Sequence, residues 1–318
     1  PWPSLANMMP RSLRKRPQAT MFLRITTLLA LSVASLPAAE NNLKWTALPD
    51  LPGGLGVAGP FVGVHNDALI IGGGANFPDG VPWRPTAGGG VSAKVYHDTI
   101  HVVTRDGDGY SIAEAKAKLP RTLGYGISVP TADGVLCIGG EWREDGETHR
   151  SAKVFALGFA DGEIAIDEKY PPLPAATTAA ARALVGETGY VAGGGSGDGA
   201  TKNFWALDLA KRGAADFGWV TLPPWDGRAR THLLASVQHD GATDCLYIFS
   251  GRMKDGDGHW RMLGDAHKFN PNSGEWKKIH DILPSGDGQP RCVMAGTVAP
   301  IGANQLLVFG GANGKRFI

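Results

Sequence analysis

The carboxylate best placed for proton transfer in this sequence is Glu141, which directly follows the pair Gly139-Gly140. Other copies of the same short pattern carry a small residue there, at Gly74, Gly195 or Ala312. A carboxylate held near the centre of a fold can take and return a proton close to neutral pH. We therefore predict Glu141 as a catalytic acid/base, with a role in capping the turn as the alternative.

Four arginines fall near the start of predicted strands, namely Arg121, Arg182, Arg230 and Arg291. If they share one position in a repeating unit, they line a common channel and bind an anion, because a guanidinium matches both oxygens of a carboxylate. We predict Arg121, Arg230 and Arg291, together with Asn76, as substrate-binding residues. The alternative is that each arginine pairs with a neighbouring carboxylate or carbonyl, and that Asn76 stabilises a turn.

The sequence predicts neither a metal site nor a cofactor site. The segment 94–103 is typical of a strand, in which His97 and His101 would lie about 13 Å apart and could not bind one ion. The glycine runs at 72–74 and 193–195 precede no predicted helix, so a phosphate-binding loop is not indicated. His259 and Trp260, in a polar segment with Arg252 and Asp255, either contact a ligand or form an exposed loop.

A repeat positions these side chains. A short apolar run ending in glycine recurs five times, and each copy follows another apolar run and a turn. Taking Gly73, Gly140, Gly194, Gly251 and Gly311 as markers, the copies are 67, 54, 57 and 60 residues apart. Aromatic strands follow three copies, and strands containing Trp45, Trp219 and Trp276 lead into Leu-Pro or a similar pair. Four strands at this period are typical of a β-propeller blade.

We therefore predict an all-β, kelch-type β-propeller, six-bladed when complete, of which this chain holds about four and a half blades. Each glycine pair allows a sharp turn near the crowded centre, because glycine adopts positive φ without steric cost. Trp45 to Pro49 resembles the last strand of a blade whose other strands lie beyond Ile318. A five-bladed ring and an antiparallel sandwich are the alternatives.

Composition excludes several other classes. Hydrophobic residues make up 43% and charged residues 19% of 318 residues, which indicates a globular chain with a sizeable core. Glycine accounts for 45 residues, about 14%, without a collagen period. The net charge of +1 provides no general attraction for nucleic acid, so we expect no nucleic-acid partner.

The first forty residues predict export. Residues 1–20 are basic without apolar periodicity and are interpreted as an upstream extension. Residues 21–39 combine Arg24, an apolar run over 25–36 and small residues at Ala38 and Ala39, the pattern of a signal peptide. We predict a propeller over 40–318 that is periplasmic or secreted, with no membrane association. Cys137, Cys245 and Cys292 lie in apolar runs, so we expect core packing, with one disulfide as the alternative.

Some segments resemble the bacterial N-acetylneuraminate epimerase (sialic acid mutarotase) family. The more specific are 61–77 and 121–130, supported by 44–52, 137–141, 228–232 and 265–271. Similar blades come late in a typical member and early here, so the chain resembles a cyclically permuted branch. The resemblance implies a mutarotase that interconverts the α and β anomers of N-acetylneuraminate. It also implies that the family's usual catalytic Glu, which follows Asn-Gly, falls beyond Ile318, because Glu141 matches a Gly-Gly-Glu of the neighbouring blade.

Anomer exchange opens and recloses a ring hemiketal, which requires proton transfer but no metal or redox cofactor. The expected partner is a small sugar, sialic acid; the sequence leaves the exact sugar and the oligomeric state open. Two alternatives are a kelch binding module without catalysis, since fold alone does not choose a function, and a copper oxidase of the galactose oxidase type. The copper enzyme would need a Cys–Tyr pair beside His ligands, so we rank it last.

Overall fold

The computed structural model describes residues 45–197, 199–282 and 291–314. The chain divides into two units, Pro1–Ala47 and Leu48–Ile318. Only residues 45–47 of the first unit are described, and they form no strand. The predicted extension at 1–20 and signal peptide at 21–39 lie outside the described residues. Within those residues, we find no helix of the length and hydrophobicity that a membrane span requires.

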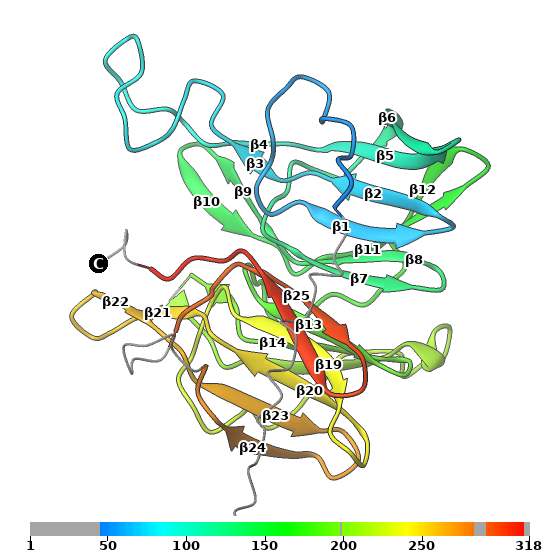
Figure 1. Cartoon of the computed structure of the whole chain (residues 1–318), viewed down its shortest axis with the longest axis vertical. Helices are drawn as coiled ribbons and strands as arrows, with labels where there is room; N and C mark the ends of the chain where they lie inside the picture. Colours follow the sequence, from blue (N-terminus) through cyan, green and yellow to red (C-terminus); the bar gives the residue numbers. More distant parts are fainter. Residues whose placement is uncertain (1–44, 198, 283–290, 315–318) are drawn as a thin grey trace, which may run out of the picture. The chain divides into compact units, whose positions relative to one another are not determined.

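In the described part of the second unit, four antiparallel sheets of four strands are followed in the chain by a sheet of two strands, and four smaller two-stranded sheets are present as well (Figure 1). We call the four-stranded sheets and the sheet that follows them blades 1 to 5 in chain order. Blade 1 comprises β1 (Phe61–His65), β2 (Ala68–Gly72), β5 (Thr99–Asp106) and β6 (Gly109–Lys118). Blade 2 comprises β7 (Ile127–Thr131), β8 (Gly134–Ile138), β11 (Val154–Ala160) and β12 (Glu163–Asp167).

The remaining blades repeat this order of strands. Blade 3 comprises β13 (Ala181–Val185), β14 (Thr188–Ala192), β17 (Phe204–Asp208) and β18 (Val220–Thr221), with a short 3-10 turn η1 (Leu209–Lys211). Blade 4 comprises β19 (Leu234–His239), β20 (Asp244–Phe249), β23 (Ala266–Asn270) and β24 (Glu275–Ile279). Blade 5 comprises β25 (Thr297–Ile301) and β26 (Gln305–Phe309). The prediction of an all-β propeller with about four and a half blades is confirmed.

A small hairpin leaves each of blades 1 to 4 between its second and third strands. These are β3 (Ala75–Asn76) with β4 (Val95–Tyr96), β9 (Glu141–Glu144) with β10 (Glu147–Arg150), β15 (Gly195–Ser196) with β16 (Gly199–Ala200), and β21 (Arg252–Lys254) with β22 (Trp260–Met262). The prediction of a single strand over 94–103 is wrong. The strand is interrupted at His97 and Asp98, where the chain passes from β4 of the hairpin to β5 of the blade. There the N–H of His97 donates to Gly74 and its carbonyl accepts from Leu123.

Each of the four hairpins begins after two residues with positive φ, and an equivalent pair follows β26 of blade 5. The pairs are Gly73-Gly74, Gly139-Gly140, Gly193-Gly194, Ser250-Gly251 and Gly310-Gly311, with φ near 65° and then near 100°. The first repeat marker is therefore Gly74, one residue later than the sequence suggested. The reason for glycine is close approach between blades: a Cβ on Gly139 would lie 2.6 Å from the backbone oxygen of Thr177, which leads into blade 3.

The blades are joined at their inner ends by a chain of backbone hydrogen bonds. The N–H groups of Tyr125, Ala179, His232 and Ala295 each donate to the equivalent residue of the preceding blade, beginning with Gly59, at 2.7–3.0 Å. All five residues have φ between 50° and 61°. The innermost strands accordingly pack in the sequence β1, β7, β13, β19, β25. The inner ends therefore follow one another around a common centre.

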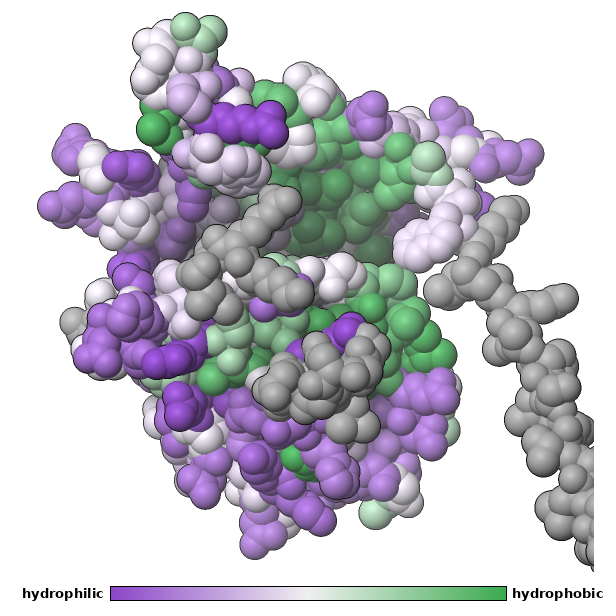
Figure 2. Space-filling model, turned by 60° about the vertical axis from the view of Figure 1, so that its left-hand side comes forward, coloured by the Kyte–Doolittle hydropathy of each residue, from purple (hydrophilic) through white to green (hydrophobic). Residues whose placement is uncertain are grey.

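The core consists of apolar layers between neighbouring blades. Trp276 of blade 4 packs on Phe204 of blade 3, with ring centroids 4.9 Å apart, and the indole of Trp219 donates to the carbonyl of Pro171. Aromatic side chains thus fill part of the space between neighbouring blades. Cys137, Cys245 and Cys292 are buried free thiols, as expected for core packing. Figure 2 shows a hollow with apolar residues in its wall between hydrophilic rims.

Candidate functional site

A cavity of about 680 Å³, called the main cavity below, lies where the hairpins meet the inner ends of the blades. Figure 1 shows three of these hairpins, β3–β4, β9–β10 and β21–β22, on the same side of the second unit. Tyr125, Ala179 and His232, which belong to the chain of hydrogen bonds at the centre, line the cavity. Its chemistry therefore comes from residues at equivalent positions of successive blades.

His232 presents a neutral imidazole to the cavity. Burial and the nearby positive charges of Arg252 and Lys94 lower its pKa from 6.5 to about 4. Its Nδ1 lies 3.0 Å from the hydroxyl of Thr231. Among the described residues no partner of Nε2 is present, so this nitrogen is the one that a ligand can reach.

Glu141 also lines the cavity and is tied to the preceding blade. The phenol of Tyr96, from β4 of blade 1, donates a 2.6 Å hydrogen bond to Oε1 of Glu141. Burial and this hydrogen bond raise the pKa of Tyr96, so the phenol stays protonated and remains a donor. Sequence reasoning thus placed Glu141 beside the cavity, although its catalytic role stays a prediction.

Arg150 lies directly across the hairpin from Glu141. In the register of the blades it is equivalent to Tyr96, since both pair with the residue that follows the glycine pair. Tyr96 donates to Glu141, the residue that follows the glycine pair of the next blade. For Arg150, the residue that follows the glycine pair of the next blade is Gly195, which has no side-chain acceptor. The Nε of Arg150 is buried without a hydrogen-bond partner in the described part of the chain.

Two lysines and a second arginine add positive charge to the cavity. The ammonium of Lys94 lies 4.7 Å from the ring centroid of Tyr125. Arg252 and Lys254, both on β21, lie 4.2 Å and 5.2 Å from the ring centroid of Trp260 on β22. Across the described ranges, Lys94, Arg150 and Lys254 form no ion pair with a carboxylate. Four cations against the carboxylates Glu141 and Asp255 leave the lining with an excess of two positive charges.

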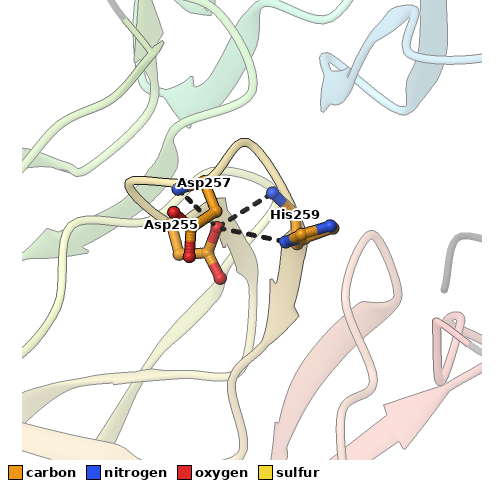
Figure 3. A group of neighbouring side chains, drawn as sticks. All are labelled: Asp255, Asp257 and His259. Carbon is orange, nitrogen blue, oxygen red and sulfur yellow. Dashed lines mark hydrogen bonds and ion pairs between the residues drawn. The ribbon is translucent and has the colours of Figure 1, made fainter.

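Asp255, Asp257 and His259 bring possible metal-ligand atoms within 4.8 Å of one another at the tip of the β21–β22 hairpin (Figure 3). Their geometry is that of a turn: Oδ1 of Asp255 accepts from the N–H groups of Asp257 and His259 at 3.1 and 2.9 Å. Its Oδ2 accepts from Arg261 at 2.7 Å. Because these contacts account for the cluster and place a cation beside it, we assign no metal to it.

The expectation that four arginines share one blade position is wrong. Blades 2 to 5 each have one residue with left-handed backbone at the inner end, namely Tyr125, Ala179, His232 and Ala295. Arg121 lies four residues before Tyr125, and Arg291 lies four residues before Ala295. Arg230 lies two residues before His232, whereas Arg182 lies three residues after Ala179. None of the four belongs to the lining of the main cavity.

Each of the arginines predicted to bind substrate has other surroundings. Arg121 is exposed, 3.6 Å from the ring centroid of Trp142. Arg230 is fully buried and donates to the carboxylate of Asp265 at 2.6 Å and to the carbonyl of Ser250 at 3.1 Å. This side chain ties together the start and the interior of blade 4. Arg291 is exposed, and its N–H donates to the carbonyl of Ile282.

Asn76 lies in a second, smaller hollow of about 240 Å³ on blade 1, where its Oδ1 is 2.9 Å from Nε2 of His97. The four residues predicted to bind substrate, Arg121, Arg230, Arg291 and Asn76, are therefore not brought together with Glu141 in the main cavity. The sequence missed Lys94, Arg150, His232 and Lys254. The sequence did contain a signal for Arg252. When Ser250-Gly251 is aligned with Gly139-Gly140, Arg252 is the equivalent of Glu141. In the structure, each of these two residues forms a β-bridge to the segment before the first strand of its blade.

Comparisons with known proteins match this architecture. The model of the N-acetylneuraminate epimerase family matches residues 170–317, which cover blades 3 to 5. Residues 170–317 therefore carry the signature of the N-acetylneuraminate epimerase family. The resemblance noted from the sequence is confirmed, while the cyclic permutation stays a prediction.

Individual relatives are similar over part of their length. An N-acetylneuraminate epimerase of Haemophilus influenzae is 29% identical over 146 residues, 46% of this chain and 34% of that protein. One of Yersinia enterocolitica is 36% identical over 112 residues, 32% of this chain and 27% of that protein. The chain thus spans about a third of the length of the curated relatives it matches. The solved structure of YjhT superposes with a TM-score of 0.65 at 15% identity, covering 86% of this chain and 82% of that one, which shows a shared fold.

Proposed function

We propose that this chain interconverts the α and β anomers of N-acetylneuraminate or a related acidic sugar. The observation that carries the proposal is the main cavity, in which Glu141 meets Lys94, Arg150 and Lys254, three cations without an ion pair among the described residues. The names of the relatives support the same substrate. A carboxylate on the sugar is the group that the excess of positive charge in the lining favours.

In the proposed reaction, Glu141 takes the proton of the anomeric hydroxyl as the bond from the anomeric carbon to the ring oxygen breaks. The electron pair of that bond goes to the ring oxygen, which receives a proton from an acid of the cavity, and the ketone forms. Lys94, whose ammonium lies 4.7 Å from the ring centroid of Tyr125, is the candidate for this acid, and neutral His232 donates or accepts a hydrogen bond. Rotation about the bond next to the ketone and reversal of these steps give the other anomer, with no net change in protons.

Arg150 and Arg252 bind the carboxylate of the sugar in this proposal. The Nε of Arg150 is a buried donor without a partner among the described residues, which costs roughly 1–3 kcal/mol in the empty site. A bound carboxylate recovers that energy and fixes the anomeric carbon beside Glu141. The chemistry needs no metal, so we expect the rate to survive dialysis against a chelator.

The test is the rate of exchange between the anomers, measured by NMR at equilibrium with catalytic amounts of the chain. We expect acceleration over buffer, reduced about 10²- to 10⁴-fold by Glu141→Gln. Glu147→Gln changes an exposed carboxylate of the same hairpin and should have no effect. Binding without acceleration would instead favour a non-catalytic sugar-binding module.

We also propose that the protein is exported. The support is the basic and apolar pattern of residues 21–39. Expression in a bacterium followed by sequencing of the mature N-terminus should give a start near Ala39 or Glu40. An uncleaved chain retained in the cytoplasm would contradict export.

A further inference from the structure

We infer that Tyr96 is a positioning residue that holds the carboxylate of Glu141 in the orientation needed for proton transfer. This inference rests on the proposed function, because it assigns a role to a residue that acts through Glu141. It adds a second residue of the β3–β4 hairpin of blade 1, next to Lys94 in the site, and this residue does not itself line the cavity.

The hydrogen bond joins two blades. Tyr96 ends β4 of blade 1, and Glu141 begins β9 of blade 2, 45 residues later. Tyr96 is 9% exposed and does not line the main cavity, whereas Glu141 does. The phenol therefore holds the carboxylate from behind without contacting a ligand in the cavity.

Only one oxygen of the carboxylate is held in this way. Oε1 of Glu141 accepts from Tyr96, and within the described residues no hydrogen bond to Oε2 is present. Fixing one oxygen orients the second, which is left for the substrate. A carboxylate held on one side loses fewer rotamers on reaction than a free one, which is the physical content of preorganisation.

The ring of Tyr96 is itself held. It packs edge-on against Tyr125, with centroids 6.3 Å apart, and the ammonium of Lys94 lies 5.7 Å from its centroid. A Cβ on Gly124 would lie 3.2 Å from the Tyr96 ring, so the backbone of blade 2 closes the remaining side. The phenol cannot turn away from Glu141 without moving these neighbours.

Other blades do not repeat this pair. The residues equivalent to Tyr96 are Arg150, Ala200 and Met262, and those equivalent to Glu141 are Ala75, Gly195 and Arg252. If the contact served only to join blades, the same chemistry would be expected at the other junctions. Tyrosine and glutamate instead occur together at one junction, and that junction borders the cavity.

The experiment compares the steady-state kinetics of anomer exchange in the wild-type chain, Tyr96→Phe, Glu141→Gln and the double variant. We expect Tyr96→Phe to lower kcat about tenfold and leave KM within twofold, because the ring remains and only the hydroxyl is lost. The double variant should equal Glu141→Gln. Tyr110→Phe, which alters an exposed tyrosine of β6, is the control and should match the wild type.

A second readout needs no substrate. The hydroxyl proton of Tyr96 should give a downfield NMR signal that is lost in Tyr96→Phe, moves upfield in Glu141→Gln, where a neutral amide oxygen replaces the carboxylate as acceptor, and is unchanged in Tyr110→Phe. A normal kcat in Tyr96→Phe, or a further loss in the double variant, would overturn the inference. If the wild-type chain does not accelerate exchange, the proposed function fails, and the assigned hydrogen bond is then judged by this signal alone; its absence in the wild type overturns it.

Discussion

At the scale of single residues, the site depends on charges that the protein itself leaves uncompensated. Arg150, Lys94 and Lys254 have no carboxylate partner in the described segments, whereas Arg230 is paired with Asp265 inside blade 4. The residue type alone did not separate these cases in the sequence. Their different environments follow from where each side chain falls relative to the glycine pair and the left-handed residue of its blade.

Removal of the Arg150 guanidinium should weaken substrate binding. We expect Arg150→Leu to raise KM at least tenfold, which corresponds to about 1.4 kcal/mol, because a charge-assisted hydrogen bond to the sugar carboxylate is lost. Arg121→Leu removes an arginine outside the main cavity and should leave KM unchanged. Steady-state kinetics of both variants provide the test, and equal KM values would argue against Arg150 as the carboxylate ligand.

Neutral His232 should make stability depend on pH. The unfolded chain protonates this side chain near pH 6.5 and the folded chain only near pH 4, with the charges of Arg252 and Lys94 opposing protonation and Thr231 bonded to the ring. The stabilisation is therefore complete above about pH 6.5 and is lost as the pH falls toward 4. At pH 5 the loss is about 2 kcal/mol.

The variant His232→Asn should remove this dependence. Asn tolerates the left-handed backbone at this position, where φ is 55°. Denaturant titrations at pH 7 and pH 5 should show a larger loss of unfolding free energy in the wild type than in the variant. The same loss in both proteins would mean that other groups cause the acid sensitivity.

At the scale of the elements, the hairpins depend on the glycine pairs that precede them. The sequence predicted these turns because the double glycine recurs at matched places, and the structure explains the requirement by contact between blades. Ser250 occupies the first position of its pair with φ of 61°, so the backbone angle alone does not exclude a side chain. At Gly139 a side chain is excluded because a Cβ would lie 2.6 Å from the backbone oxygen of Thr177.

Two alanine substitutions separate these effects. Gly139 and Gly107 have similar φ of 65° and 57°, but a Cβ on Gly139 would lie 2.6 Å from the Thr177 oxygen, whereas one on Gly107 would meet nothing within 4 Å. We expect Gly139→Ala to cost about 1–3 kcal/mol more than Gly107→Ala. Thermal or denaturant unfolding measures the difference, and equal costs would refute crowding as the cause.

The register between hairpins could not be predicted from the sequence. Tyr96 and Arg150 become equivalent only when β3–β4 is superposed on β9–β10, and 18 residues separate Asn76 from Val95 in one hairpin while a two-residue turn connects the other. Because the two connections differ so much in length, nothing in the sequence indicated that Tyr96 contacts Glu141. The blades themselves were predictable because Trp276, Phe204 and the glycine pairs mark the same strands in each repeat.

At the scale of the whole second unit, the inner ends of five blades lie side by side, and the hairpins of blades 1 to 4 contribute to the lining of the main cavity. The sequence indicated this arrangement through its period, and Glu141 through its unusual position beside a glycine pair. The other cavity residues come from four blades and are separated by up to 166 residues in the chain, from Lys94 to Trp260. Such a set is visible only in the folded protein.

The most direct test of the central claim is a crystal structure of the chain with N-acetylneuraminate. The account predicts the sugar in the cavity between the hairpins, its carboxylate within hydrogen-bond distance of Arg150 or Arg252, and its anomeric hydroxyl facing Glu141. A sugar bound elsewhere at saturating concentration, with this cavity holding only water, would contradict it.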